Sequence, residues 1–301
     1  MSGFLALAMF GTLVATLLLG FPVAFTLGAI AIFFGIPTLG LDIFYLLPMR
    51  IYGIMTNFTL LAVPLFIFMG VILERSGLAE RLLRDLSDLF GSLRGGLTVS
   101  AVLVGAILGA TTGVVGATVV TLGVIALPAM IKQKYPTGIA AGTIATAGTL
   151  GQIIPPSIVL ILLGDQISAA YQQAQLAKGN FAPEAVSVTD LFMGALLPGL
   201  CLVFLYILWQ IIYANIYPKN MPAIPKSERD MVNFVELRNR VIKVLIPPLF
   251  LIFAVLGSIL AGLATPTESA GVGAIGAMIL AYSRKQFNIK ILKEVAVSTA
   301  Q

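Results

Sequence analysis

The chain has 301 residues, of which 58% are hydrophobic and only 10% are charged, and its formal net charge is +5. Soluble globular domains carry about 25% charged residues, so this composition predicts a membrane protein. With no histidine, one cysteine and no basic helix face, the sequence argues against zinc, haem and iron–sulfur centres, an internal disulfide and nucleic-acid binding. We therefore expect no cofactor.

The charge-free start of the chain, residues 1–41, is too long for one helix and is interrupted at Gly20-Phe21-Pro22. Because proline removes a backbone donor and ends or kinks a helix, we predict two segments, about 4–20 and 22–36. The start lacks the positive region of a signal peptide, so we expect both segments to be retained.

An interfacial stretch bounded by Asp42 and Arg50 precedes a predicted single span over residues 51–73, with Pro64 inside it. Residues 74–94 are charged but keep leucines at helical spacing. That pattern predicts an amphipathic helix along the membrane interface. A soluble connecting helix is the alternative.

The next charge-free run, residues 95–131, carries glycine throughout, at Gly95, Gly96, Gly105, Gly109, Gly113, Gly116 and Gly123. As one straight helix it would measure roughly 55 Å, whereas the hydrocarbon core is only ~30 Å thick. We therefore predict two half-length helices that meet at a glycine–threonine tip over residues 110–118. Such a hairpin survives at membrane depth only where its backbone faces protein or a water-filled cavity, which is where transporters bind solutes and ions.

A second interrupted stretch, residues 135–164, contains the adjacent prolines Pro155 and Pro156. Two successive prolines cannot continue a regular helix. The sequence predicts a helix over about 137–149, an unwound bend, and a second helix over about 156–164.

The remaining segments are assigned by their charge. Residues 165–189 are polar and predict an extramembrane loop, and residues 190–217 predict a long span. The densest group of cations follows in residues 218–243, at Lys219, Lys226, Arg229, Arg238, Arg240 and Lys243. By the positive-inside rule we predict that this loop is cytoplasmic and that the loop at 165–189 is periplasmic. Spans at 244–263 and 267–282 and a cytoplasmic tail from Arg284 complete the pattern.

Glu268 is the only charged residue between 244 and 283. An ionisable group at membrane depth is expensive and suggests a functional role. Alternatively, Glu268 lies in the first turn of a helix that Thr265 or Thr267 caps, where backbone N–H groups satisfy it. The sequence leaves both readings open.

The two interrupted segments offer the chemistry of a solute and ion site. Unwound backbone carbonyls coordinate Na⁺, and the N-termini of half-helices attract carboxylates. The candidate residues are Thr111, Thr112, Gly113, Gly116, Thr149, Gly151, Gln152, Pro155, Pro156 and Glu268, with Na⁺ expected at Thr112, Gly113, Thr149 and Gly151. For any single glycine, close helix packing is the more frequent role; for the two clusters as a pair, we favour a site.

Three strings carry a family resemblance: GATTGVVGATVVTLGVIALPAM, GTIATAGTLGQIIPPSIVLILLGDQ and LAGLATPTESAGVGAIGA. In this order they resemble the large, DctM-like membrane subunit of tripartite ATP-independent periplasmic (TRAP) transporters, most of all the branch labelled for mannitol or chloroaromatic compounds. The resemblance covers essentially the whole chain.

The resemblance implies an all-α polytopic protein of the bacterial inner membrane, not an enzyme, that works as an elevator-type secondary transporter. It implies symport of an organic acid with Na⁺, and two partners: a small TRAP membrane subunit and a periplasmic solute-binding protein. The hairpin of the family falls on residues 97–131 and its first unwound helix on 137–164.

Together, the charge pattern and the resemblance predict five regions. These are scaffold-type helices over 1–94 with the interfacial amphipathic helix 74–94, a transport-domain core over 95–164, a periplasmic loop over 165–189, scaffold helices over 190–263 with the cytoplasmic basic loop 218–243, and the start of a second repeat over 264–301.

The family continues beyond the TPTESAG segment with a second hairpin and a second bend, as expected for inverted repeats. This sequence therefore holds one full repeat and the start of the second, and we expect it to be truncated at its C-terminus relative to the family. A non-transporting fragment or scaffold chain is the alternative function. A membrane-embedded enzyme is a distant third, because Glu268 cannot serve as both acid and base.

Overall fold

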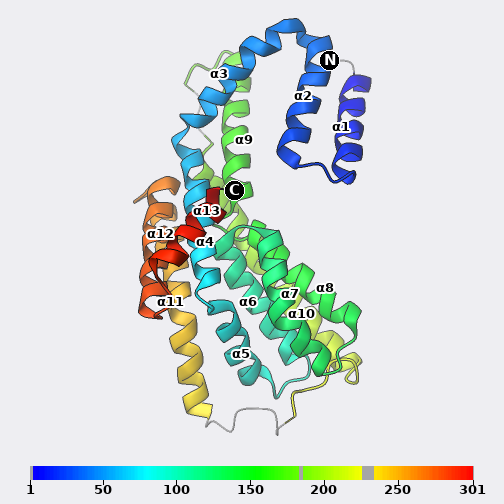
Figure 1. Ribbon diagram of the computed structural model, residues 1–301, viewed down its shortest axis with the longest axis vertical. Coiled ribbons are helices and arrows are strands. Elements are labelled where there is room, and N and C mark those ends of the chain that lie inside the picture. The colour runs from blue at the N-terminus through cyan, green and yellow to red at the C-terminus, as the bar shows by residue number, and fades with distance from the viewer. Residues whose placement is uncertain (1–2, 183–185, 226–233, 301) are drawn as a thin grey trace. The chain divides into compact units, whose positions relative to one another are not determined.

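The computed structural model describes residues 3–182, 186–225 and 234–300, and every regular element in these ranges is helical. Five helical segments within them are long and apolar enough to cross a membrane, namely Val23–Met55, Phe58–Arg75, Val115–Lys132, Val188–Ile216 and Val235–Leu260. The predicted all-α polytopic class is therefore confirmed. The chain divides into two compact units, Met1–Asn57 and Phe58–Gln301 (Figure 1).

The first unit contains the helices α1 (Gly3–Leu18), α2 (Val23–Leu39) and α3 (Ile43–Met55). The predicted break between the first two segments is confirmed. Gly20 adopts a left-handed conformation with φ of +84°, and Pro22 immediately precedes α2. Glycine accepts this conformation without steric cost, and proline starts a new helix readily.

The predicted single span over 51–73 is wrong, because the chain leaves the helix between Met55 and Ala62. The helix α3 ends where Thr56 donates its hydroxyl to the Tyr52 carbonyl, and a short 3₁₀ turn, η2 (Phe58–Leu61), leads into α4 (Ala62–Arg75). Pro64 lies in the first turn of α4, where a missing backbone donor breaks no helical hydrogen bond.

The charged segment after α4 forms a shorter helix than predicted, α5 (Leu78–Phe90). Gly77, with φ of +63°, separates it from α4, so Glu74 and Arg75 belong to the end of α4. Four leucines of α5, Leu78, Leu82, Leu83 and Leu86, are buried, and the helix packs against α6 and α11. Its position at the membrane interface stays a prediction.

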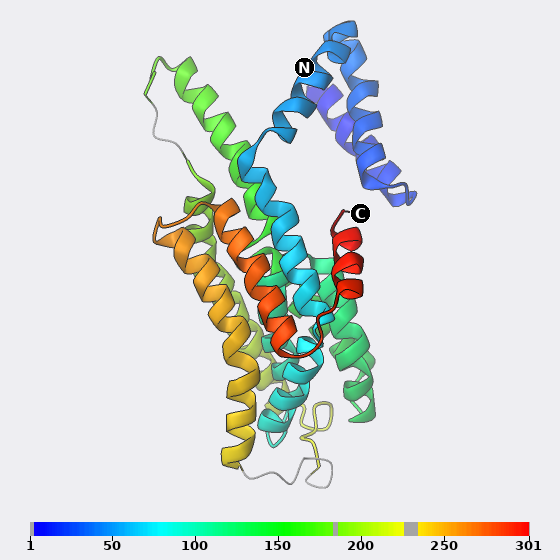
Figure 2. The same ribbon diagram turned by 60° about the vertical axis from the view of Figure 1, so that its left-hand side comes forward.

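The second unit is built around α6 (Gly96–Thr112), most of whose residues are buried. It packs against α4, α5, α7 (Val115–Lys132), α8 (Thr137–Thr149) and α10 (Val188–Ile216). Figures 1 and 2 show α6, α7 and α8 side by side. At the turn between α7 and α8, Tyr135 donates its hydroxyl to the Pro222 carbonyl at 3.1 Å. Burial raises the pKa of Tyr135 to about 12, and backbone groups of Gly95 and Leu97 oppose this shift.

The helix α9 (Ile158–Ala177) continues well beyond its predicted end at 164, so the first half of the predicted loop 165–189 is helical. This stretch is rich in alanine and glutamine, which favour helix regardless of polarity. Gly179, with φ of +81°, follows the helix end. Polarity therefore did not mark a helix end here, and the extramembrane position of this segment stays a prediction.

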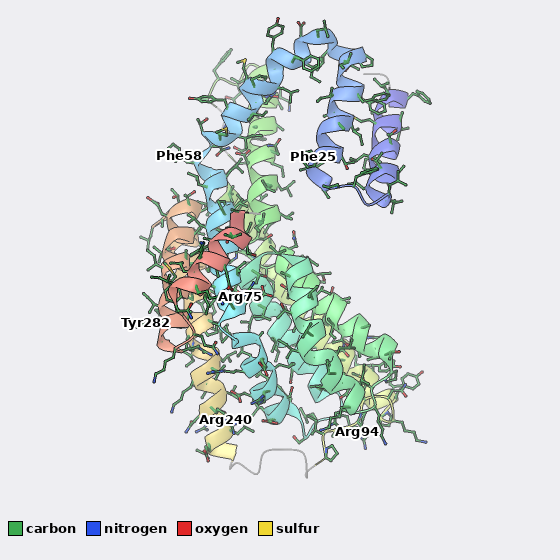
Figure 3. All side chains as sticks on the ribbon, in the orientation of Figure 1. Phe25, Phe58, Arg75, Arg94, Arg240 and Tyr282 are labelled. Carbon is green, nitrogen blue, oxygen red and sulfur yellow. The ribbon has the colours of Figure 1, made fainter. Side chains whose placement is uncertain are left out.

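The rest of the second unit contains α11 (Phe234–Leu260), α12 (Pro266–Ser283) and α13 (Ile289–Ala300). The predicted spans at 190–217 and 244–263 correspond to α10 and α11, whereas the segment at 267–282 forms the helix α12 but is not among the five segments long and apolar enough to cross a membrane. The helix α11 starts earlier than predicted and takes in Arg238, Arg240 and Lys243, whereas Lys226 and Arg229 lie outside the described residues. Figure 3 shows Arg94 and Arg240 toward the same end of this unit.

Candidate solute and ion site

The predicted break at the hairpin tip is present between α6 and α7, but the prediction of half-length helices is wrong for α7, which is long and apolar enough to cross a membrane. The helix α6 ends at Thr112, Gly113 adopts a left-handed conformation with φ of +61°, and Val114 is extended. The Gly113 N–H donates to the Gly109 carbonyl at 2.9 Å, which closes the end of α6 as an αL cap. Because Val114 provides no side-chain cap, the first N–H groups of α7 remain available at the tip.

A hydroxyl pair holds the two sides of the tip together. The Oγ1 atoms of Thr112 and Thr118 are 2.9 Å apart, and Thr118 donates to the Val114 carbonyl at 3.0 Å. The Val114 N–H reaches the Thr112 hydroxyl at 3.4 Å. Thr112 therefore connects the end of α6 to the first turn of α7.

The predicted bend after α8 is also present. A single 3₁₀ turn, η3 (Leu150–Gln152), follows Thr149, and an irregular stretch leads to α9. Ser157 caps α9 by accepting from the Leu160 N–H at 3.4 Å, and it donates its own hydroxyl to the Gln152 carbonyl at 2.7 Å. Pro155 and Pro156 are buried in this stretch, where neither contributes a backbone donor.

The last turn of α6, just before the tip, is in direct contact with the bend, although the two are far apart in sequence. A Cβ atom at Gly109 would lie 2.6 Å from the Cα atom of Gly151, and one at Gly151 would lie 2.8 Å from the Cα atom of Gly109. The backbones therefore touch at a point where neither residue can carry a side chain. This contact is close packing between helices, which the sequence analysis gave as the alternative to a binding role for any single glycine. The same contact also brings the two candidate clusters together.

The start of α9 lies against the tip as well. A Cβ atom at Gly113 would lie 3.5 Å from the backbone nitrogen of Ile158. The start of α9 thus lies against Gly113, just before the N-cap residue of α7, and the end of α8 packs on α6 where Ala147 meets Gly105. Two positive helix ends and two negative ends meet in one region, and each end carries roughly half an elementary charge.

The candidate hydroxyls differ in their surroundings. Thr111 is buried and donates to the Leu108 carbonyl at 2.8 Å, whereas Thr149 is exposed and donates to the Thr146 carbonyl at 2.7 Å. Both hydroxyls keep their oxygen lone pairs for a further partner. Gln152 is half-buried, and a Cβ atom at Gly116 would meet open space.

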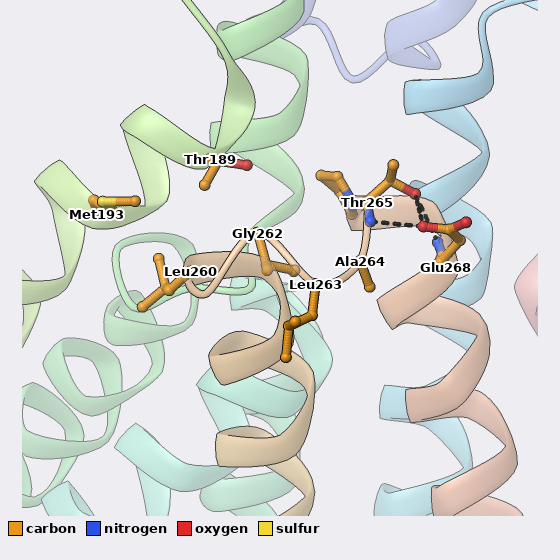
Figure 4. Close-up of a pocket in the computed structure, with 10 residues that line it drawn as sticks. Thr189, Met193, Leu260, Gly262, Leu263, Ala264, Thr265 and Glu268 are labelled. Carbon is orange, nitrogen blue, oxygen red and sulfur yellow. Dashed lines mark hydrogen bonds between the residues drawn. The ribbon is translucent and has the colours of Figure 1, made fainter.

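Glu268 lies apart from the tip and the bend, at the start of α12. One carboxylate oxygen accepts from the Thr265 N–H at 2.7 Å and from the Thr265 hydroxyl at 2.8 Å, and the Glu268 N–H donates back to that hydroxyl at 3.3 Å. This reciprocal arrangement is a capping box. Figure 4 shows it beside a pocket of about 360 Å³, which Thr189, Met193 and Leu263 also line. The capping role is thus present, and a coupling role for Glu268 stays a prediction.

Sequence reasoning overlooked a carboxylate close to the hairpin. Glu74, at the end of α4, accepts a hydrogen bond from the Thr121 hydroxyl of α7. The sequence signal was present, because Glu74 ends a long apolar run and Thr118 and Thr121 share a helix face. It was missed because Glu74 was grouped with the charged residues that follow it.

These features define a class of protein: a polytopic helical membrane protein with two broken segments in contact, as in secondary transporters. Residues 10–301 match the family model described as the DctM component of the tripartite ATP-independent periplasmic transporter. The chain belongs to this family of transporter permeases, which are not enzymes, and is a multi-pass protein of the bacterial inner membrane.

Three relatives illustrate the similarity. The C4-dicarboxylate TRAP transporter large permease protein DctM of Rhodobacter capsulatus is 31% identical over 98% of this chain and 64% of its own length. The isethionate TRAP transporter permease protein DctMQ of Oleidesulfovibrio alaskensis is 29% identical over 90% of this chain and 39% of its own length. The ectoine TRAP transporter large permease protein TeaC of Halomonas elongata is 28% identical over 91% of this chain and 58% of its own length. The chain thus spans less than two thirds of each relative.

Proposed function

We propose that this chain forms part of a Na⁺-coupled importer in which an organic acid and the coupling ion bind where the hairpin tip meets the bend. The observation that carries this proposal is the backbone contact between Gly109 and Gly151. It brings the interrupted ends of α6 and α8 together at the start of α7 and α9, and such convergence of broken helices is typical of the solute sites of secondary transporters.

The polarity of the helix ends supports both ligands. The N-termini of α7 and α9 offer N–H groups and positive potential to a carboxylate. The ends of α6 and α8 offer carbonyl oxygens to Na⁺, together with Thr112, Gly113, Thr149 and Gly151. Gln152 and Gly116 complete the proposed solute side, Gln152 through its amide and Gly116 through its accessible backbone.

The transport cycle and the partners belong to the same proposal. Membership of the family supports a small TRAP membrane subunit and a periplasmic solute-binding protein as partners, an elevator motion of the core at 95–164, and an inverted second repeat. The relatives' names mention C4-dicarboxylates, isethionate and ectoine, so we propose only the broad class of organic acids. We also propose that the chain belongs to the branch of the family labelled for mannitol or chloroaromatic compounds.

Uptake into proteoliposomes tests the proposal. The complete permease containing this chain, its small subunit and its binding protein are reconstituted together, and uptake of a labelled organic acid is measured with an inward Na⁺ gradient. We expect uptake to require both Na⁺ and the binding protein, and Thr112→Val to weaken the Na⁺ dependence. Thr12→Val is the matched control, because that exposed hydroxyl only donates to its own helix. Uptake that ignores Na⁺ or the binding protein would contradict the proposal.

A further inference from the structure

Two arginines of the second unit lie close together without an acidic partner. Arg81 is exposed in the first turn of α5, and Arg284 is half-buried where α12 ends. The ion pairs found among the described residues include neither guanidinium group. Burial lowers the pKa of Arg284, and the positive charge of Arg81 lowers it further. The two charges therefore act on each other while both lack a counter-charge.

The turn after α12 determines where Arg284 lies. The Gln286 N–H donates to the Ala281 carbonyl at 3.1 Å, and the Lys285 N–H donates to the Tyr282 carbonyl at 2.9 Å. These two hydrogen bonds form a Schellman motif, whose left-handed position is usually glycine. Here Lys285 occupies it with φ of +57°. The chain therefore turns sharply after Arg284, the C-cap residue of α12.

After this turn the chain packs against the start of α5. A Cβ atom at Gly77, the residue before α5, would lie 3.2 Å from the Oε1 atom of Gln286. Arg81 is one helical turn beyond Gly77, whose carbonyl accepts from the Arg81 N–H at 3.4 Å. The Arg284 guanidinium also donates to the Val244 carbonyl of α11 at 3.5 Å. Packing between α5, α11 and the end of α12 thus brings the two arginines together.

The carboxylates of the surrounding helices are paired with other arginines. The pairs are Glu80 with Arg84 at 3.7 Å, Asp85 with Arg240 at 3.9 Å, and Glu294 with Arg75 at 3.4 Å. The C-terminal dipole of α12 offsets part of the Arg284 charge, but Arg81 lies near the N-terminus of α5, where a positive charge is unfavourable. The described residues therefore leave a net positive charge at this place, which an anion would offset.

The two arginines lie at a boundary between charged and uncharged sequence. The helix α11 is apolar enough to cross a membrane, and its charge-free part begins at Val244, directly after Lys243. The helix α12 carries no charge between Glu268 and Arg284. Figure 2 shows α4, α11 and α12 side by side, and the hydrogen bond from Arg284 to Val244 joins the two boundaries. Because membrane helices carry their cations at their ends, we expect the arginines at the level of the lipid headgroups.

We infer that Arg81 and Arg284 bind the phosphate group of an anionic phospholipid. A guanidinium fork matches the geometry of phosphate oxygens, and basic pockets between membrane helices on the cytoplasmic side bind anionic headgroups. A lipid suits this place better than free phosphate, because its acyl chains hold the headgroup where α11 and α12 enter the bilayer. Bound lipid would connect α5 to the end of α12. The inference does not depend on the proposed Na⁺-coupled transport.

Native mass spectrometry of the purified 301-residue chain tests the inference. The chain is released from phosphatidylcholine nanodiscs that contain rising fractions of phosphatidylglycerol. We expect one phosphatidylglycerol molecule to be retained per chain in preference to phosphatidylcholine. In Arg81→Gln and in Arg284→Gln, the phosphatidylglycerol fraction at half-occupancy should rise ~5-fold. Arg284→Lys keeps the charge but loses the planar fork, so its effect should be smaller.

The matched control is Lys178→Gln, which removes one exposed positive charge at the end of α9 and should leave retention unchanged. Circular dichroism identifies a variant that fails to fold, and Arg81→Gln then decides alone, because Arg81 is exposed. Equal retention of the two lipids, or retention that neither glutamine variant changes, overturns the inference. A second experiment adds inorganic phosphate to the lipid-bound chain. Displacement of phosphatidylglycerol by millimolar phosphate would assign the site to the free anion and overturn the lipid assignment.

Discussion

The two units of the chain differ in how closely neighbouring backbone approaches their glycines: in the first unit the one crowded glycine, Gly35, meets only the Ile43 side chain, whereas several glycines of the second unit meet backbone. In the first unit, a Cβ atom at Gly3, Gly11, Gly28 or Gly53 would meet nothing within 4 Å. In the second unit, a Cβ atom at Gly70, Gly105, Gly109 or Gly151 would lie within 3 Å of a neighbouring backbone or Cβ atom. Glycine content alone therefore does not identify a functional contact, since the same residue type fills both roles.

The difference in packing has a thermodynamic consequence. Only Thr26, Ile30 and Ile43 are buried among the described residues of the first unit, whereas the second unit has an extensive core centred on α6. Packed interiors resist added volume, but an exposed helix surface does not. Substitutions should therefore be costly in the second unit and nearly neutral in the first.

The largest effect is expected for Gly109→Ala. Its Cβ atom would collide with the backbone of Gly151, which cannot rotate away as a side chain could, so we expect destabilisation near the upper end of the ~1–3 kcal/mol range for overpacking. Gly11→Ala, the control in α1, should be neutral or stabilising by up to ~1 kcal/mol. Chemical denaturation of the two variants in micelles measures the contrast, and equal tolerance of both would refute the comparison between the units.

A smaller loss is expected for Asp85→Asn in α5. Asp85 is buried and lies 3.9 Å from Arg240 of α11, whose side chain is 35% exposed. Removing one partner of a buried pair is destabilising, and the exposure of Arg240 reduces this to about 2 kcal/mol. A double-mutant cycle with Arg240→Gln should give a non-additive result. Strict additivity would mean that the pair does not couple α5 to α11.

The cap of α12 should contribute less. Thr265→Ala removes the hydroxyl of the capping box and is expected to cost ~1 kcal/mol, whereas Thr265→Ser should retain most of the stability. In the first unit, α2 begins after Pro22 without a side-chain cap, so it has no equivalent contribution to lose. Thermal unfolding of both variants checks this, and a serine variant as unstable as the alanine variant would argue against the cap.

The smallest effect at neutral pH is expected for Tyr135. Its pKa is raised by burial from 10.0 to about 12, so folding favours the neutral phenol. The resulting stability is complete below pH 10 and is lost as the pH rises from 10 to 12. Tyr135→Phe should flatten the profile of unfolding free energy in this window. A variant that keeps the same alkaline decline would assign that decline to other groups.

Sequence reasoning found the two broken segments because their causes are local. A left-handed glycine at Gly113 and the adjacent prolines Pro155 and Pro156 interrupt helices wherever they occur. It placed the end of α9 wrongly, because polarity reports solvent and not helix propensity. It also missed the break near Asn57, since an apolar run gives no signal when a helix ends inside it.

The contacts between these segments could not be predicted. Nothing in the local sequence pairs Gly109 with Gly151 or Glu74 with Thr121, because these pairs are distant along the chain and depend on how α4, α7 and η3 pack around α6. Glu268 shows the same limit. The local sequence Thr265-Pro266-Thr267-Glu268 predicts that Glu268 takes part in a helix cap, but it does not predict that Glu268 lies away from the hairpin.

The sequence by itself determined that the chain is helical and membrane-embedded, and where its helices break, because hydropathy, glycine and proline act within one or two turns. Only the tertiary structure decided which breaks touch, which glycines are crowded and which carboxylate faces the hairpin. Those outcomes depend on close packing between helices, which no single segment encodes.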